Sequence, residues 1–296
     1  MLLAAGAFAL TATAAARELR VCPAASAAAP CDYAGDDAIQ QAVEAARSGD
    51  SIRIRAGTYT PRRVRDVAFQ QLRIRGYVVI EGRDLALLGE PGAILDGSAG
   101  VPASALVVRG GRVTLRNLTV RGFRAADPED DVYDGHGLFM IDAQATISDV
   151  VFERLAKMAV TLRGHGSARI DGLRIVDGHV GIWLEEQAQL RLRDAVIRNN
   201  ESAGLCAYGE STARIEHALF QDNRDDGVYG EGQATIELTR SALVGNAPYG
   251  LRAAGHARIH ASQVMLADNA TAPTAEEAAG RVRLGAGALA LGLRLR

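Results

Sequence analysis

Three residue types that support acid–base chemistry lie close together at Tyr133, Asp134 and His136. An imidazole titrates near neutral pH, and a neighbouring carboxylate can orient it, so His136 with Asp134 has the make-up of a general base. The sequence therefore indicates His136 as the main catalytic candidate, with Asp134 and Tyr133 beside it. The alternative is a histidine in a turn that makes only local hydrogen bonds.

An acidic run comes just before this group. Its members are Asp127, Glu129, Asp130 and Asp131. Carboxylate oxygens are the ligands that Ca²⁺ prefers, although no complete calcium-loop motif is present. These side chains are therefore the candidate ligands of a Ca²⁺ ion, and the sequence indicates no other cofactor.

The elements that must position these residues are repeats. The stretch from Gly137 to Ala272 consists of six similar segments, whose starts lie 22 or 23 residues apart. A fixed period between roughly 20 and 50 residues is typical of a solenoid. The starts are Gly137, Ala159, Gly181, Gly204, Gly227 and Gly250.

Within each segment, apolar residues alternate with a period of two, which predicts strands with one buried face. Each copy closes on a polar corner such as Asp222-Asn223, where asparagine tolerates left-handed backbone angles and can bond along a ladder of neighbours. Each segment is therefore expected to form one coil of a parallel β-helix. The alternating apolar positions of the first copy are Leu138, Met140, Ala145, Ile147, Val150 and Phe152.

The repeat also predicts which distant residues share a face. Lys157 and His179 lie just ahead of the first strand in the next two coils, as Asp134 and His136 do in theirs, so both join the catalytic candidates. An insertion at 125–136 lengthens one coil by about ten residues, and such insertions form loops that often lie on the binding face. Asp225-Asp226 offers a second, adjacent pair of carboxylates.

Outward positions of the first strand form a candidate binding surface. Aromatic residues make up only 5% of the chain, yet several stand at these positions with charged residues between them. Aromatic rings stack on the C–H faces of sugars, and charged groups bond to sugar hydroxyls and carboxylates. The alternative is that these aromatics are ordinary strand formers. The predicted substrate-binding residues are Phe139, Arg163, Trp183, Glu185, Tyr208, Tyr229 and Glu231, and Cys206 is expected to point outward among them.

The N-terminal region contains export signals. Residues 1–16 are apolar and end in Ala14-Ala15-Ala16, which predicts a signal peptide and hence a periplasmic or secreted protein with no membrane attachment after cleavage. Residues 17–35 form a lead-in in which Cys22 and Cys31 are the natural disulfide pair of an oxidising compartment. The remainder, 36–296, is expected to be a single β-helix domain that begins with a short capping helix after Asp36-Asp37. TAPTAEEAAG at 271–280 is expected to be a turn with a short helical piece.

This pattern resembles the right-handed parallel β-helix superfamily, which includes pectate lyases, polygalacturonases and alginate epimerases. The helix followed by GDSIRIRAGTY is similar to the N-terminal cap of that superfamily. Asp127-Pro128-Glu129-Asp130 is similar to the Asp-Pro-His-Asp motif of the epimerases, with Glu129 in place of the histidine, and Gly135-His136-Gly137 and Gly164-His165-Gly166 are similar to a Gly-His-Gly of polygalacturonases. The resemblance implies an acidic polysaccharide as the partner.

Two functions remain open from the sequence. One is a lyase, epimerase or hydrolase of uronate polysaccharides, which needs several titratable groups within hydrogen-bond reach of one another. The other is a non-catalytic carbohydrate-binding or cell-surface scaffold, which needs only the binding surface. A net charge of −2 gives no indication of a nucleic-acid partner.

Overall fold

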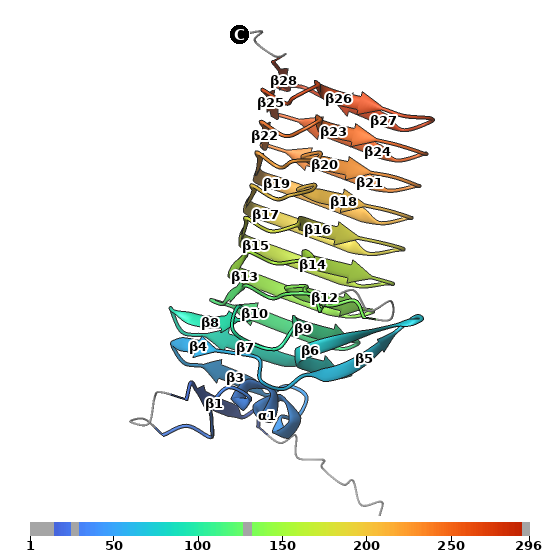
Figure 1. Cartoon of the computed structure of the whole chain (residues 1–296). Coiled ribbons are helices and arrows are strands. Elements are labelled where there is room, and N and C mark those ends of the chain that lie inside the picture. Colours follow the sequence, from blue (N-terminus) through green and yellow to red (C-terminus); the bar gives the residue numbers. More distant parts are fainter. Residues whose placement is uncertain (1–14, 25–29, 127–131, 292–296) are drawn as a thin grey trace, which may run out of the picture.

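The structure, a computed structural model, describes residues 15–24, 30–126 and 132–291. The chain winds into a right-handed parallel β-helix in which each coil stacks on the one before it (Figure 1). The predicted solenoid is therefore confirmed. Residues 1–14 of the expected signal segment and the calcium candidates Asp127, Glu129, Asp130 and Asp131 lie outside the described residues. In the part of the chain that the structure describes, no helix has the length and apolar character of a membrane span.

One sheet of ten strands contains the first strand of each repeat, and its neighbours pair in parallel from β6 onward. The pairing register is the one expected from the repeats, since Leu138 pairs with Val160 and Trp183 with Cys206. Its strands are β5 (Arg65–Phe69), β6 (Leu72–Glu81), β9 (Ser104–Arg109), β12 (Leu138–Ile141), β14 (Met158–Arg163), β16 (Val180–Leu184), β18 (Leu205–Ala207), β20 (Val228–Gly230), β23 (Tyr249–Ala253) and β26 (Ala272–Glu276).

The other sheet has eighteen strands and forms the remaining walls of the coils. Its strands are β1 (Glu18–Cys22), β2 (Tyr33–Ala34), β3 (Ser51–Ile54), β4 (Gly57–Tyr59), β7 (Leu85–Gly89), β8 (Ala93–Asp96), β10 (Arg112–Arg116), β11 (Thr119–Arg121), β13 (Gln144–Glu153), β15 (Ser167–Val176), β17 (Gln189–Arg198), β19 (Thr212–Gln221), β21 (Thr235–Thr239), β22 (Ala242–Val244), β24 (Arg258–Ser262), β25 (Met265–Ala267), β27 (Arg281–Leu284) and β28 (Leu289–Ala290).

Each long strand of this sheet bends once. The bend in β13 lies at Asp149 and the bend in β19 at His217, both with positive φ. A single residue in this left-handed conformation bends the strand while its pairing with the neighbouring coils continues. It also lengthens the spacing between two inward-pointing residues by one. This explains why the buried positions of β13 run Ala145, Ile147, Val150 and Phe152, with one gap of three.

A buried asparagine ladder closes the coils, as expected from the corners. Asn200 Nδ2 donates to Asn223 Oδ1 at 2.8 Å, Asn223 Nδ2 to Asn246 Oδ1 at 2.9 Å, and Asn246 Nδ2 to Asn269 Oδ1 at 3.1 Å. All four side chains are almost fully buried, so they can satisfy backbone groups that water does not reach. The residue before each one, such as Asp222 at φ 52°, takes the left-handed turn.

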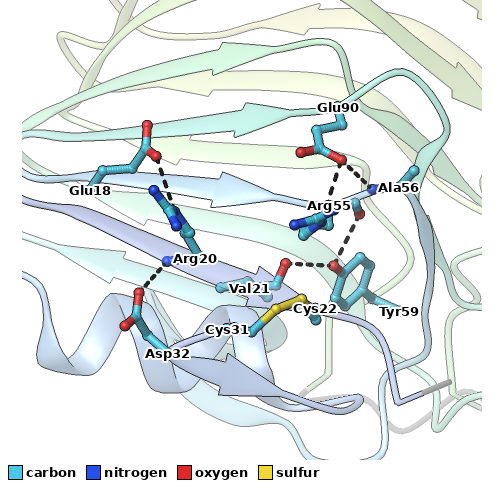
Figure 2. Close-up of a disulfide and its surroundings, with 10 residues drawn as sticks. All are labelled: Glu18, Arg20, Val21, Cys22, Cys31, Asp32, Arg55, Ala56, Tyr59 and Glu90. Atoms are coloured by element: carbon cyan, nitrogen blue, oxygen red, sulfur yellow. Dashed lines mark hydrogen bonds and ion pairs between the residues drawn. A yellow bond between two sulfur atoms is a disulfide. The ribbon is translucent and has the colours of Figure 1, made fainter. Parts of the chain in front are cut away.

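The N-terminal cap begins earlier than expected. Residues 18–22, assigned from the sequence to a lead-in, already form β1, which pairs in parallel with both β2 and β3. Val21 and Cys22 are fully buried, so this segment belongs to the solenoid. Figure 2 shows Cys22 joined to Cys31 by a disulfide, and Tyr59 donating from its hydroxyl to the Val21 carbonyl at 3.1 Å.

The predicted helix is α1 (Ala38–Ala45), which covers the end of the solenoid. Its Gln40 is almost fully buried and bonds in both directions to Val79 of β6: the amide oxygen accepts from the Val79 N–H at 2.7 Å, and the amide nitrogen donates to the Val79 carbonyl at 3.4 Å. The helix therefore satisfies strand groups that would otherwise be exposed at the edge.

Two segments differ from the expectation. β5 folds back antiparallel on the first half of β6, forming a hairpin that projects from the coils (Figure 1). The segment 271–280 contains β26 where a short helical piece was expected, because pairing with β23 continues the ten-stranded sheet.

Candidate functional site

The insertion ends in a buried ion pair between Asp134 and Arg75 of β6. Asp134 Oδ1 accepts from the Arg75 backbone N–H at 2.7 Å, and Oδ2 accepts from Arg75 Nε at 2.6 Å. Asp134 is 1% exposed, and its burial raises the pKa of its carboxyl, which the bonds from Arg75 partly offset. The carboxylate is therefore directed at the hairpin and not at His136.

His136 is fully buried. Its Nδ1 lies 3.2 Å from Ser104 Oγ, and its Nε2 has no hydrogen-bond partner among the described residues. The ring packs edge-on against Tyr133 and Phe139, with centroids 4.6 Å and 4.8 Å away. Burial, together with the nearby cations Lys157 and Arg163, lowers the pKa of His136 to about 3, so the imidazole is neutral near neutral pH.

The other two catalytic candidates have contacts of their own. Lys157 Nζ lies 5.3 Å from the centre of the Tyr133 ring, and His179 Nδ1 lies 3.6 Å from Glu201 Oε2 at the surface. His136 and Lys157 thus both contact the Tyr133 ring, whereas Asp134 is held by Arg75 and His179 lies beside Glu201. The structure does not bring Asp134, His136, Lys157 and His179 together as one reacting group.

Phe139 was predicted to face solvent, and this is wrong. Its side chain does point away from the solenoid core, but the β5–β6 hairpin covers it, and Phe69 packs edge-on against it at 5.1 Å. Thr161, in the same outward row, is buried too. In this part of the sheet, outward-pointing side chains therefore form a second, smaller core under the hairpin.

Beyond the hairpin the aromatic residues do lie together at the surface. Trp183, Tyr208 and Tyr229 come from three successive coils and are each half-buried; we call them the aromatic track. The ring centroids of Trp183 and Tyr208 are 4.5 Å apart, and those of Tyr208 and Tyr229 are 5.7 Å apart. Trp183 and Tyr229 stand at equivalent positions of their coils, and the ring of Tyr208, two residues beyond the equivalent Cys206, contacts both, so the three rings form a continuous row.

Cys206 occupies the position between Trp183 and Tyr229 and was also expected to point to solvent. It is only 5% exposed, because the Tyr208 side chain bonds to it and contacts the rings on both sides. Burial raises the pKa of the Cys206 thiol to about 12, so it remains protonated. A small residue at 206 leaves room for the Tyr208 ring in the track.

The end of the track nearest the hairpin is charged. The Arg163 guanidinium pairs with Glu185 and with Glu186, and it lies 4.9 Å from the centre of the Phe69 ring. Arg163 and Glu185 are both largely covered, with side chains 14% and 25% exposed. The two charges therefore offset each other at this end.

The other end of the track carries a denser charged cluster around Arg252. Its guanidinium stacks 4.3 Å from the centre of the Tyr229 ring, and its Nε donates to the buried Asp226 at 2.5 Å. Tyr229 donates from its hydroxyl to Glu231 at 2.7 Å. Burial raises the pKa of Asp226 to about 6, although the ion pair with Arg252 acts in the opposite direction.

Arg252 was not among the predicted binding residues, although it stands in the same outward row of the first strand as Tyr229. The alignment of the repeats could have identified it, because Arg252 occupies the position in its coil that Tyr229 occupies in the coil before. Asp226 was considered only as one of two adjacent carboxylates, and the structure separates their roles: Asp226 is buried against Arg252, whereas Asp225 lies 4.0 Å from that arginine and is 41% exposed. Across residues 15–24, 30–126 and 132–291, no group of three His, Cys, Asp or Glu side chains is placed to hold a metal ion.

Comparisons with known proteins agree with this architecture. The family model described as the right-handed beta helix region matches residues 104–268. Among solved structures, the pectate lyase Pel9A has a TM-score of 0.62 and 14% sequence identity, covering 85% of this chain and 70% of the lyase chain. A search of curated protein sequences finds no match.

Two further solved structures are similar. The family 28 exopolygalacturonase of Yersinia enterocolitica has a TM-score of 0.58 at 13% identity, covering 92% of this chain and 65% of its own. The A-module of the mannuronan C-5 epimerase AlgE6 of Azotobacter vinelandii has a TM-score of 0.53 at 14% identity, covering 81% and 73%. At these identities the likeness establishes the fold alone.

Proposed function

Because the chain belongs to the right-handed β-helix family, we propose that it binds an acidic polysaccharide along the aromatic track. The observation that carries this proposal is the row of Trp183, Tyr208 and Tyr229 on three successive coils. The arginine at each end is already paired with carboxylates of this chain, so the rings supply the main contact. A polymer lying along the solenoid axis would place sugar faces on the rings. The structurally similar lyase, exopolygalacturonase and epimerase, by their names, act on polysaccharides, which supports the same class of ligand.

We propose binding without catalysis as the function that the described residues around the end of the insertion support best. A catalytic site needs two or three groups that converge within hydrogen-bond reach. Asp134 and His179 have partners elsewhere, and the described contacts among Tyr133, His136 and Lys157 are ring contacts at 4.6 Å and 5.3 Å, not hydrogen bonds. His136, buried and neutral, supports the packing under the hairpin.

We further propose that the protein is exported to the periplasm or secreted. The apolar segment at the start of the chain is one reason. The disulfide between Cys22 and Cys31 is another, since disulfides persist mainly in oxidising compartments.

The single tryptophan of the chain gives a direct test of binding. Trp183 fluorescence would be titrated with polygalacturonate, with alginate and with a neutral glucan, each with and without Ca²⁺. We expect a saturable change with the acidic polymers and a Tyr229→Ala variant that binds about tenfold more weakly, since an aromatic contact contributes ~0.5–1.5 kcal/mol beyond its burial. Tyr33→Ala, at the far N-terminal end, is the matched control. Unchanged fluorescence at every polymer concentration would contradict the proposal.

A second candidate function is acid–base catalysis at Asp226. Its pKa of about 6 lies near the range in which a general acid or base works best, and it adjoins Tyr229 and Arg252 at the end of the track. Incubation with the same polymers, followed by mass spectrometry and proton NMR, distinguishes the functions. Products that appear with the wild type and not with Asp226→Asn would support catalysis, and intact polymer in both would support binding alone.

A further inference from the structure

The outer face of the eighteen-stranded sheet has a channel along the solenoid. It consists of three adjoining cavities. The first, of about 250 Å³, and the second, of about 260 Å³, share the lining residues Gln189 and Arg191. The second ends at Thr235 and Glu237, where a third of about 360 Å³ begins. Each coil adds one side chain to each wall, so the channel runs across the strands. Its long, narrow shape can accommodate a linear polymer.

One wall of the channel is a row of arginines. Arg169 pairs in register with Arg191, and Arg191 with Arg214, on three neighbouring strands. Neighbouring strands are about 4.8 Å apart, and like charges directly opposite each other on a sheet are destabilising. On the other side of this row, Arg193 lines a further cavity of about 360 Å³. The folded chain thus holds positive charge together at an energetic cost.

Two of these arginines form no ion pair with a described residue, although Asp171, Glu216 and Glu237 line the neighbouring cavity with them. Arg214 Nε lies 3.1 Å from Glu237, and Arg193 Nε lies 3.3 Å from Asp194. For the exposed Arg169 and Arg191, the described part of the chain provides no hydrogen bond or ion pair to the guanidinium. An anion lying in the channel would meet both groups.

We propose that this channel is a second binding site, with Arg169 and Arg191 at its centre, for a carboxylate-bearing polysaccharide. A guanidinium bonds a carboxylate through two parallel N–H donors, so each coil can hold one charged sugar. Ser167, Gln189 and Thr212 on the opposite wall offer hydroxyl and amide groups to sugar hydroxyls. The site lies on a different sheet from the aromatic track, so the proposal for the channel does not depend on binding at the track.

The composition of the channel favours a sugar over a single-stranded nucleic acid. Proteins that bind single strands stack the bases on aromatic side chains, and the described residues that line the three cavities include no Phe, Tyr or Trp.

The test is fluorescence anisotropy with a labelled oligogalacturonate in a Trp183→Ala background, where the aromatic track is weakened. We expect Arg169→Gln/Arg191→Gln to lower the remaining affinity at least tenfold. Arg191→Lys alone should lower it by a smaller factor, because lysine keeps the charge but not the two parallel donors. Arg174→Gln/Arg198→Gln is the matched control, because it removes the same charge from the same two strands beyond the bend. It should change affinity less than twofold. Thermal unfolding should show all variants folded.

Several outcomes would overturn the proposal: equal losses for both arginine pairs, no loss for Arg169→Gln/Arg191→Gln, or tighter binding of a single-stranded DNA oligomer than of oligogalacturonate. The result also separates the two sites. If Trp183→Ala alone leaves the affinity unchanged and the Arg169/Arg191 pair is required, the channel is supported and the aromatic track is not.

Discussion

Asp134 and Arg75 lie 59 residues apart in sequence, yet their buried ion pair fastens the end of the insertion to the β5–β6 hairpin. The carboxylate accepts from both the backbone and the side chain of Arg75, which leaves neither of its oxygens without a partner. Close by, Tyr133 N–H donates to the Arg73 carbonyl at 2.9 Å. A residue that the sequence indicated as part of a catalytic pair therefore holds two segments together.

Asp134→Ala is expected to destabilise the protein by about 3 kcal/mol, because it leaves the largely buried guanidinium of Arg75 without its charge partner. Urea denaturation followed by circular dichroism would measure the loss. Asp66→Ala is the matched control: its carboxylate on the same hairpin is 58% exposed and 3.7 Å from Arg73, and such surface pairs contribute about 0–1 kcal/mol. Unchanged stability in Asp134→Ala, with loss of a polymer-modifying activity, would restore the catalytic interpretation.

The repeat made most of the fold predictable. A period of 22 or 23 residues stacks like residues on like, so the strand register, the buried positions and the asparagine ladder all follow from aligning the copies. The same alignment placed Trp183, Tyr208 and Tyr229 on one surface. The repeat could not predict contacts between the coils and segments that lie outside the repeat.

The hairpin is such a segment. Nothing in the periodicity pairs 65–69 with 72–76 or folds that arm over the sheet, so Phe139 was expected at the surface. An outward position in the register is therefore not the same as an exposed one. The partners of Asp134 and the burial of His136 were missed for this reason, as was the covering of Cys206 by a ring two residues along the chain.

Asn223→Ala in the middle of the ladder should cost about 3–5 kcal/mol, since each buried polar group left without a partner costs ~1–3 kcal/mol. The side chain accepts from the N–H and Nδ2 of Asn200 and donates to Asn246 and to the Ile197 carbonyl. Asn269→Ala, at the end of the ladder, should cost somewhat less, because its side chain makes three such bonds, from the N–H and Nδ2 of Asn246 and to the Leu243 carbonyl, and none to a further asparagine among the described residues. Denaturation midpoints would report both. Equal, sub-kilocalorie effects would mean that water replaces the ladder.

His136 should make the protein less stable in acid. Its pKa is lowered to about 3 in the folded state, so below pH ~6.5 the unfolded chain takes up a proton that the native state does not. The free energy of unfolding should therefore fall by about 1.36 kcal/mol for each pH unit below that value, until about pH 3. The measurement is urea denaturation between pH 4.5 and 7.5 for the wild type and His136→Leu. Only His136→Leu should lose this slope, and the exposed His165→Gln should keep it; a slope retained in His136→Leu would show that another group causes it.

Asp226 should act with the opposite sign over a similar pH range. Its pKa is raised to about 6 by burial, whereas a carboxyl in the unfolded chain titrates near 3.8, so between these values the native state holds the extra proton. The stability that this proton contributes is complete below pH ~3.8 and is lost as the pH rises through about 6. Relative to Asp226→Asn, the wild type should thus lose about 1.36 kcal/mol per pH unit across that window and show a constant difference above it. Asp225→Asn, which changes a partly exposed carboxylate beside it, is the control. If the difference in the free energy of unfolding between wild type and Asp226→Asn does not vary from pH 4 to 7, the ion pair with Arg252 outweighs the effect of burial. Asp226 would then carry a full negative charge at the end of the aromatic track throughout that pH range.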